Sequence, residues 1–218
     1  MYEYILFDLD GTLTDPKVGI TTCVQHALKG FGIEENDLNK LTPFIGPPLK
    51  QSFMQFYGLN DEEAERAVAL YRERFSVVGM YENEIYPGIP MLLKTLKEKG
   101  KRLAISSSKP TIYVVEILKH FDIHQYFDVI VGSELDGRRT DKAEVVEEAL
   151  SQLFGGEKKT HSEVVIVGDR KFDVEGGQAH DITTVAVSYG YGPMEELVEA
   201  KAEYIVDTVE QLQDLLAQ

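Results

Sequence analysis

The sequence contains a single cysteine, has fewer basic than acidic residues, and lacks any long apolar run. One thiol excludes an internal disulfide and a cysteine-based metal cluster. Cys23 falls on the apolar side of a helical pattern, which favours a buried thiol over a nucleophile. No segment approaches a membrane span, and the apolar part of MYEYILFDLDG is too short and too acidic for a signal peptide. We therefore expect a cytoplasmic protein.

The charge balance restricts the partners. With 22 basic and 37 acidic side chains, the formal net charge is -15, and no basic patch interrupts it. A nucleic acid polymer or an anionic membrane would be repelled by such a surface, so neither is expected. An anionic substrate would require positive charge within the site, from a metal ion and a few placed lysines. The oligomeric state is left open between a monomer and a homodimer.

The order of apolar segments predicts an α/β fold. Five short runs without alternation are typical of strands buried on both faces of a parallel sheet, and segments with helical spacing lie between them over 89–96, 114–121 and 146–153. We therefore expect a Rossmann-like sheet with helices on both faces. The five predicted strands are YILFD from Tyr4, RLAIS from Arg102, FDVIV from Phe127, VVIVG from Val164 and TTVAV from Thr183.

One connection is too long for a single crossover helix. Roughly 90 residues separate the first two predicted strands, and two stretches with helical spacing, 20–31 and 64–78, lie there on either side of LTPFIGPPL. We therefore predict a catalytic core of residues 1–15 and 84–218, with a helical cap of residues 16–83 inserted after the first strand. At the carboxyl end of the sheet such an insert is expected to act as a lid.

Polar residues follow the predicted strands. Asp8 and Asp10, in FDLDGTLTD, come directly after the first strand, where two neighbouring carboxylates need a cation or a shared proton unless they form a solvated acidic turn. The second strand ends in AISSSKP, whose hydroxyls and amides either cradle an anion or cap the next helix. Ser106, Ser107 and Lys109 are the residues of interest there.

Two further segments complete the set. Lys142 stands in the first turn of a predicted helix, with Asp141 as the N-cap of that helix. Its charge opposes the helix dipole, so it is either a functional residue of the site or an ordinary surface lysine. Asp169 and Asp173 follow the fourth strand in VGDRKFD. Just beyond them, Gly176 and Gly177 suggest a tight turn or a close helix contact. The carboxyl ends of parallel strands share one sheet edge, so these groups are expected to converge.

These four segments, in this order, resemble the signatures of the haloacid dehalogenase-like phosphatases. The resemblance covers nearly the whole chain. It implies that Asp8 attacks phosphorus to form an aspartyl-phosphate, and that Asp10 protonates the leaving group and then activates water. It also implies that Ser106 and the Ser107 amide hold the phosphoryl oxygens. Lys142 would neutralise the nucleophile and the phosphate, with Lys109 as its nearest competitor.

The same resemblance implies a magnesium site. Asp8, Asp169 and the backbone carbonyl of Asp10 would ligate Mg²⁺, because this ion prefers hard oxygen donors. Asp173 would orient a ligand or a metal-bound water. We therefore count Asp8, Asp10, Asp169 and Asp173 as the metal-site residues.

The cap position is similar to the phosphoglycolate phosphatase branch, and FIGPPLKQSF and GSELDGRRTDK resemble a bacterial subgroup of 5'-nucleotidases. The expected substrate is a small phosphorylated metabolite. Phe44, Pro47, Pro48 and Lys50 would form either an aromatic and basic lid surface that binds it or a packed helix connection. A phosphotransferase similar to β-phosphoglucomutase is the enzymatic alternative, and a non-catalytic module that retains the fold is the other.

Overall fold

The chain forms two compact units. The computed structural model describes residues 2–155 and 163–218. One unit comprises Met1–Thr14 and Ile85–Gln218, and the other comprises Asp15–Glu84. The chain leaves the first unit through β2, Thr14–Asp15, and returns through β3, Glu84–Ile85, and these two short strands pair with each other.

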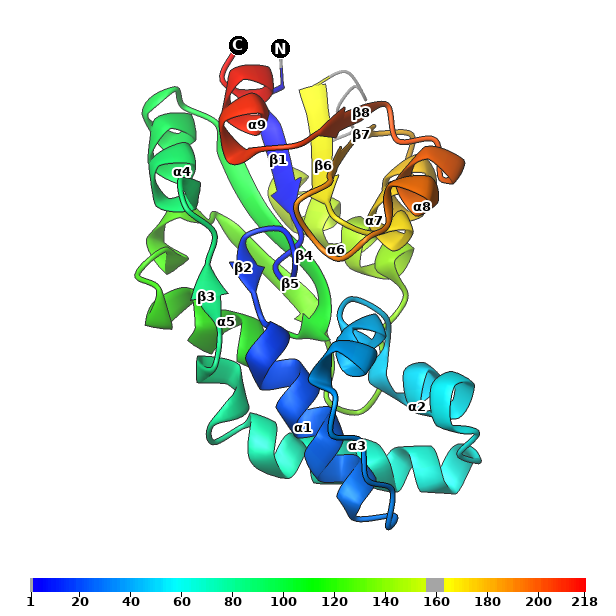
Figure 1. Cartoon of the computed structure of the whole chain (residues 1–218). Helices are drawn as coiled ribbons and strands as arrows, with labels where there is room; N and C mark the ends of the chain where they lie inside the picture. Colours follow the sequence, from blue (N-terminus) through cyan, green and yellow to red (C-terminus); the bar gives the residue numbers. More distant parts are fainter. Residues whose placement is uncertain (1, 156–162) are drawn as a thin grey trace. The chain divides into compact units, whose positions relative to one another are not determined.

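The larger unit is built on a six-stranded parallel sheet with the order β5-β4-β1-β6-β7-β8 (Figure 1). The predicted α/β class with a parallel core is confirmed. The central strands carry unbroken apolar runs because both of their faces are covered. The strands are β1 Tyr4–Phe7, β4 Arg102–Pro110, β5 Val129–Ser133, β6 Val164–Gly168, β7 Thr183–Val187 and β8 Tyr204–Val206.

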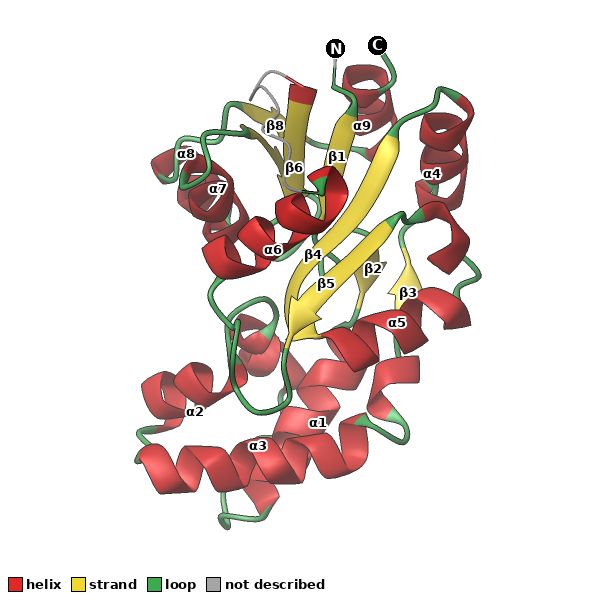
Figure 2. Cartoon of the chain, turned by 180° about the vertical axis from the view of Figure 1, so that it is seen from behind, coloured by secondary structure: helices red, strands yellow, loops and turns green. Residues whose placement is uncertain are grey.

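Helices cover both faces of this sheet. In Figure 2, α6 and α7 lie in front of the strands, whereas α4 and α9 lie together behind them. Apolar side chains of α6 and of the strands form a shared core that includes Leu6, Val146 and Ile166. The helices of this unit are α4 Ile89–Glu98, α5 Thr111–His120, α6 Lys142–Phe154, α7 Lys171–Gln178, α8 Met194–Glu199 and α9 Val209–Leu216, with a 3-10 turn η3 at His124–Tyr126.

The smaller unit is helical. Its central pair is α1 and α3, and α3 starts with a full capping box in which Asn60 and Glu63 satisfy each other's backbone amides. The apolar stripe predicted to reach Val78 is wrong at its end, because α3 stops at Phe75 and Val78 is exposed. The elements are α1 Lys17–Lys29, η1 Leu38–Phe44, α2 Leu49–Tyr57, α3 Asp61–Phe75 and η2 Gly79–Tyr81.

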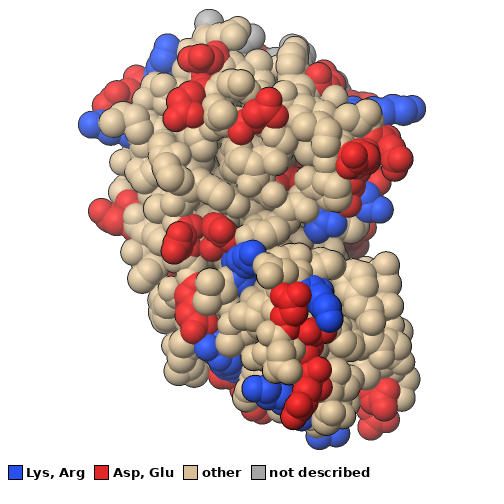
Figure 3. All heavy atoms as spheres, viewed as in Figure 1, with Lys and Arg blue, Asp and Glu red and all other residues tan. Residues whose placement is uncertain are grey.

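Three features of the structure can be compared with the composition: the surface charges, the single cysteine and the apolar character of the helices. Acidic and basic side chains are interspersed over the face shown in Figure 3. Cys23 is buried in the helical unit, as expected. Within residues 2–155 and 163–218, none of the helices has the length and apolar character needed to cross a bilayer.

Candidate active site

The loop after β1 carries two buried carboxylates. Asp8 and Asp10 are 5% and 7% exposed. The Asp8 amide donates to the Val167 carbonyl at 2.9 Å, which extends the pairing of β1 with β6 by one residue. The chain then turns sharply at Gly11, whose φ of 80° suits glycine. A Cβ at Gly11 would lie 2.1 Å from an oxygen of Asp169, so only glycine fits between these two segments.

Lys142, at the start of α6, joins the loop after β1 to α7. Its Nζ lies 2.9 Å from Asp8 Oδ1 and 2.6 Å from Asp173 Oδ1, and it donates to the Ser106 carbonyl at 2.7 Å. Burial alone would lower the pKa of this ammonium, but Asp173 and Asp8 outweigh that effect and raise it. Lys142 therefore stays charged. The predicted N-cap of α6 is also present, because the Asp141 side chain accepts a hydrogen bond from the Ala143 amide at 2.8 Å.

Lys109, at the end of β4, binds the other carboxylate. Its Nζ lies 2.8 Å from Asp10 Oδ2, and both side chains are buried. Burial raises the pKa of Asp10 above its ordinary value, and the charge of Lys109 opposes this rise. The sequence suggested that the two lysines compete for one role, but each pairs with a different carboxylate. Lys142 contacts Asp8, and Lys109 contacts Asp10.

The serines of β4 lie beside these lysines. Ser106 is fully buried, and within the described part of the chain its hydroxyl has no hydrogen-bond partner. Ser107 is buried too, and its Oγ accepts a long bond of 3.4 Å from the Lys109 amide. Neither serine is the N-cap of α5, which begins after Pro110 without a side-chain cap. A buried hydroxyl without a partner is costly, which favours a ligand as its partner.

Asp169 and Asp173 close the site from β6 and α7. The Asp169 Oδ2 accepts from the Tyr191 amide at 2.7 Å, while its Oδ1 has no partner among the described residues. The Asp173 Oδ2 accepts from the Arg170 amide at 3.1 Å. Burial, reinforced by neighbouring carboxylates, raises the pKa of Asp169 well above its ordinary value. Burial also raises the pKa of Asp173, to about 6, against the opposing charge of Lys142.

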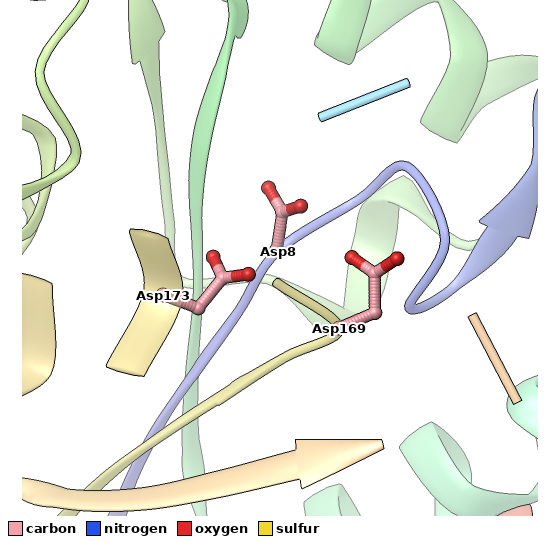
Figure 4. A group of neighbouring side chains, drawn as sticks. All are labelled: Asp8, Asp169 and Asp173. Atoms are coloured by element: carbon pink, nitrogen blue, oxygen red, sulfur yellow. The ribbon is translucent and has the colours of Figure 1, made fainter. Parts of the chain in front are cut away.

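The acidic side chains fit a divalent cation. Asp8, Asp169 and Asp173 face one another (Figure 4), each offering an oxygen, and these atoms lie within 4.8 Å of one another. With Asp10, the site holds four buried carboxylates against two buried lysines, Lys109 and Lys142. When all are ionised, two negative charges remain uncompensated, which is the charge that one divalent cation supplies.

Close packing fixes these groups in place. A Cβ at Gly168 would lie 2.0 Å from the Asp173 carboxyl carbon, and one at Gly176 would lie 2.7 Å from Lys142 Cγ. Gly176 therefore allows α7 to approach Lys142, which agrees with the close helix contact that the sequence suggested. Because each glycine leaves no space for a methyl group, the carboxylate and the lysine have little freedom to move.

Sequence analysis missed the segment between β7 and α8. Tyr189 donates its hydroxyl to the Thr12 carbonyl at 3.0 Å, and the Tyr191 amide binds Asp169. Burial raises the pKa of Tyr189, so its hydroxyl stays protonated. Glu196, on α8, accepts from Arg170 Nε at 2.8 Å and from the Lys171 amide at 3.0 Å. The only sequence signal was the glycine-rich run YGYG, which no chemical motif explains.

The helical unit contains the remaining predicted residues. Lys50 pairs with Asp61 at 2.7 Å and with Glu65 at 3.0 Å. Phe44 is buried and packs against Phe53 at a ring distance of 4.9 Å. For Phe44, the packed helix connection is therefore correct and the exposed aromatic lid surface is wrong.

Comparison with known proteins identifies the family. A family model described as haloacid dehalogenase-like hydrolase matches residues 5–187. A 5'-nucleotidase of Pseudomonas aeruginosa is 47% identical over 90% of this chain and 87% of its own. A phosphoglycolate phosphatase of Aquifex aeolicus is 32% identical over 86% of this chain and 85% of its own. The expected likeness to the phosphoglycolate phosphatase branch and to 5'-nucleotidases is confirmed.

Two other relatives complete the comparison. Tyrosine-protein kinase PtkA of Mycobacterium tuberculosis is 38% identical over 98% of this chain and 72% of its own. The crystal structure of a predicted phosphatase from Clostridium acetobutylicum has a TM-score of 0.94 and 43% identity, and the match covers 99% of this chain and 98% of that one. The chain therefore belongs to the haloacid dehalogenase-like hydrolase family and is one of its phosphatases, a hydrolase of phosphomonoesters.

Proposed function

We propose that this chain is a magnesium-dependent phosphatase that hydrolyses nucleoside 5'-monophosphates through an aspartyl-phosphate on Asp8. One observation carries the mechanism. Asp8 and Asp10 lie two residues apart, yet each is bound by a different buried lysine, Lys142 at 2.9 Å and Lys109 at 2.8 Å. Neighbouring carboxyl groups with different partners can take different roles in one reaction.

The first step is phosphoryl transfer to the enzyme. A carboxylate oxygen of Asp8 attacks phosphorus, the bond from phosphorus to the ester oxygen breaks, and the leaving alcohol takes a proton from Asp10. Burial raises the pKa of Asp10 above its ordinary value, which favours the protonated form that this step requires. Lys142 orients the Asp8 carboxylate through its hydrogen bond, and the Ser106 hydroxyl, buried without a partner among the described residues, donates to a phosphoryl oxygen.

The second step releases phosphate. Asp10, now ionised, takes a proton from water as the water oxygen attacks phosphorus. The bond from phosphorus to Asp8 breaks, which regenerates the Asp8 carboxylate and the protonated Asp10. One residue thus serves as acid and then as base, which two successive displacements at one phosphorus atom permit.

Mg²⁺ fits this scheme as the cation of the site. When bound, it neutralises charge on the phosphoryl group and on the carboxylates. Asp8, Asp169 and the Asp10 carbonyl would hold it. Asp173 lies 2.6 Å from Lys142 and accepts from the Arg170 amide, which supports an orienting role for this residue.

The substrate class rests on the relatives and on the helical unit. A 5'-nucleotidase at 47% identity supports nucleotides over phosphoglycolate. We propose that residues 16–83 act as a cap that recognises the part of the substrate that does not react, with Lys50 as a candidate contact. In that role Lys50 would exchange Asp61 and Glu65 for a phosphorylated ligand.

Two substitutions test the chemistry. Asp8→Asn should abolish turnover of p-nitrophenyl phosphate, because an amide is neither a nucleophile nor a charged ligand. Asp10→Asn should retain Mg²⁺ binding and lose about a hundredfold or more in kcat. Appreciable turnover by pure Asp8→Asn protein would contradict the assignment of the nucleophile. A loss of Mg²⁺ affinity in Asp10→Asn as large as in Asp169→Asn would make the Asp10 side chain a ligand.

A substrate screen tests the nucleotide assignment. Phosphate release should be measured with Mg²⁺ for nucleoside 5'-monophosphates, phosphoglycolate and sugar phosphates, and ranked by kcat/KM. We expect a nucleotide to rank first. If phosphoglycolate or a sugar phosphate exceeds every nucleotide by more than about tenfold, equal to about 1.4 kcal/mol in the transition state, the nucleotidase proposal fails and the phosphatase stands.

Phosphotransfer is the second candidate, and the relative named tyrosine-protein kinase PtkA is the observation that favours it. A transferase would pass the phosphoryl group from Asp8 to an acceptor hydroxyl instead of water. In the β-phosphoglucomutase-like alternative, the acceptor hydroxyl belongs to a sugar phosphate. Glucose bisphosphate formation without net phosphate release would identify a mutase, and stoichiometric release of phosphate from every substrate would exclude transfer.

A further inference from the structure

We propose that Tyr189 is a positioning residue for proton transfer, and that its hydroxyl holds Asp10 in place through the turn that contains Thr12. The inference rests on the proposed function, because it takes Asp10 as the acid and base. Tyr189 belongs to none of the four signatures, and it lies on the segment between β7 and α8. Its role is suggested by three contacts within the larger unit.

The first contact is a hydrogen bond to the turn. The Tyr189 hydroxyl donates to the Thr12 carbonyl at 3.0 Å. The turn itself is held internally by Leu9, whose carbonyl accepts from the amides of Leu13 at 2.9 Å and Thr14 at 3.1 Å. These bonds fix the end of the turn to its beginning but do not fix the turn to the sheet. Tyr189 supplies such a tie from the segment that follows β7.

The second contact is made by the residues next to Tyr189. The Tyr191 amide binds Asp169 Oδ2 at 2.7 Å. A Cβ at Gly190 would lie 2.4 Å from both Asp169 Cβ and the Gly11 carbonyl, so the backbone here packs directly on both groups. One short segment therefore touches Asp169, Gly11 and Thr12, and Gly11 follows Asp10 directly in the chain. A shift of this segment would move Asp10 relative to Asp169.

The third contact orients the phenol ring. Tyr86 packs edge-on against Tyr189, with ring centroids 5.0 Å apart and an interplanar angle of 65°. The Tyr86 amide also donates to the Leu13 carbonyl at 3.1 Å, one residue beyond Thr12. Tyr86 thus contacts both the Tyr189 ring and the turn, and it holds the ring next to the turn to which the Tyr189 hydroxyl donates. Removing the hydroxyl alone should keep this packing and lose only the hydrogen bond.

Loss of the Tyr189 hydrogen bond should impair proton transfer by Asp10 and leave the attack of Asp8 on phosphorus unaffected. Lys142 holds Asp8 independently at 2.9 Å, so loss of the Tyr189 bond leaves the nucleophile anchored. Asp10 depends on Lys109 and on the turn. A general acid must lie within hydrogen-bond reach of the leaving oxygen, so a small displacement lowers its contribution. Poor leaving groups need that proton, whereas p-nitrophenolate leaves readily without it.

The experiment compares Tyr189→Phe with wild type and with Tyr204→Phe, which makes the same change at an exposed tyrosine of β8. The kcat/KM should be measured with Mg²⁺ for p-nitrophenyl phosphate and for an alkyl phosphate, because this parameter reports formation of the aspartyl-phosphate. Circular dichroism and the melting temperature check the fold. For Tyr189→Phe we expect a loss of about tenfold with the alkyl phosphate and of less than about threefold with p-nitrophenyl phosphate.

The outcomes separate the two proposals. Equal losses on both substrates, or no loss on either, would overturn the positioning role of Tyr189. Asp10→Asn serves as the reference, since it should show the same dependence on the leaving group in a stronger form. If Asp10→Asn loses equally on both substrates, the proposed role of Asp10 fails. If only Tyr189→Phe lacks the dependence, the role of Asp10 stands and the inference about Tyr189 falls.

Discussion

Each of the two units contains a lysine that binds two carboxylates, but the two arrangements differ in exposure. In the core, the side chains of Lys142, Asp8 and Asp173 are 6%, 7% and 3% exposed. In the helical unit, Lys50 is 37% exposed and bridges Asp61 and Glu65, which are 73% and 66% exposed. One ammonium group and two carboxylates thus form a buried cluster in the larger unit and an exposed cluster in the helical unit.

The contrast teaches that the ion pairs alone say little about function. The pKa of Lys50 is raised by its hydrogen bonds to Asp61 and Glu65, and the pKa of Lys142 is also raised, although burial opposes it. The direction of the shift is therefore the same at both places. What differs is the cost of losing a partner, because water screens the exposed group and cannot reach the buried one.

Lys142→Met should have the largest effect. It leaves Asp8 and Asp173 buried without their cation, so we expect kcat/KM to fall about a thousandfold and the free energy of unfolding near pH 8 to fall by about 3 kcal/mol. Phosphate release and urea unfolding measure the two quantities. A loss of activity below about tenfold would place the buried lysine in the same class as the exposed one.

The pH dependence of metal binding should be the next largest effect. In the metal-free protein the pKa of Asp173 is raised to about 6 and that of Asp169 is raised as well, so the folded state takes up protons more readily than the unfolded chain. These groups therefore make the metal-free protein less stable as the pH rises through 6. A metal ion must displace these protons, so its apparent affinity should fall as the pH falls, by about tenfold per pH unit for each proton displaced.

Thermal unfolding with and without Mg²⁺ at pH 5, 6, 7 and 8 measures this coupling. The increase in melting temperature caused by Mg²⁺ should be small at pH 5 and should grow towards pH 8. The same increase at every pH would mean that the carboxylates are ionised without the metal.

Lys109→Met should have an intermediate effect. Because Lys109 opposes the rise in the Asp10 pKa that burial causes, its removal should raise that pKa further. Asp10 must lose a proton to act as a base and hold one to act as an acid, so both limbs of the pH–rate profile should move to higher pH. We expect kcat at pH 7 to fall about tenfold. A profile with unmoved limbs would show that Lys109 does not act through Asp10.

Lys50→Met should have the smallest effect and is the matched control for Lys142→Met. An exposed pair contributes little, so we expect a change in melting temperature of less than about 2 °C and unchanged turnover of p-nitrophenyl phosphate. The KM for a nucleoside 5'-monophosphate carries the remaining information. A rise in that KM alone would assign Lys50 to substrate binding, and an unchanged KM would remove it from the site.

The sequence allowed prediction of the core strands, because apolar runs such as VVIVG from Val164 lack alternation. Strand β8 was missed because it has only three residues and Tyr204 is exposed at the edge of the sheet. The convergence of Asp8, Lys142 and Asp169 followed from their places after successive strands. The partners of each lysine did not follow, because sequence spacing does not determine which carboxylate an ammonium group reaches.

The segment between β7 and α8 illustrates a second limit. Its contributions are a backbone amide at Tyr191, a phenol at Tyr189 and the absence of side chains at Gly190 and Gly192. None of these forms a pattern of charged or nucleophilic residues that a search for chemistry would detect. Gly192 would place a Cβ 2.0 Å from the Asp169 carbonyl, which explains the glycine only once the contact is known.

The pairing of β2 with β3 has a consequence for how this protein can change over generations. The chain enters and leaves residues 15–84 through adjacent, paired strands, so the two ends of the insertion lie side by side. A segment with adjoining ends can be shortened, lengthened or exchanged without altering the path of the sheet. The two units can therefore evolve as separable modules, and a chimera joined at Thr14 and Ile85 is the natural way to graft a different insertion onto the larger unit.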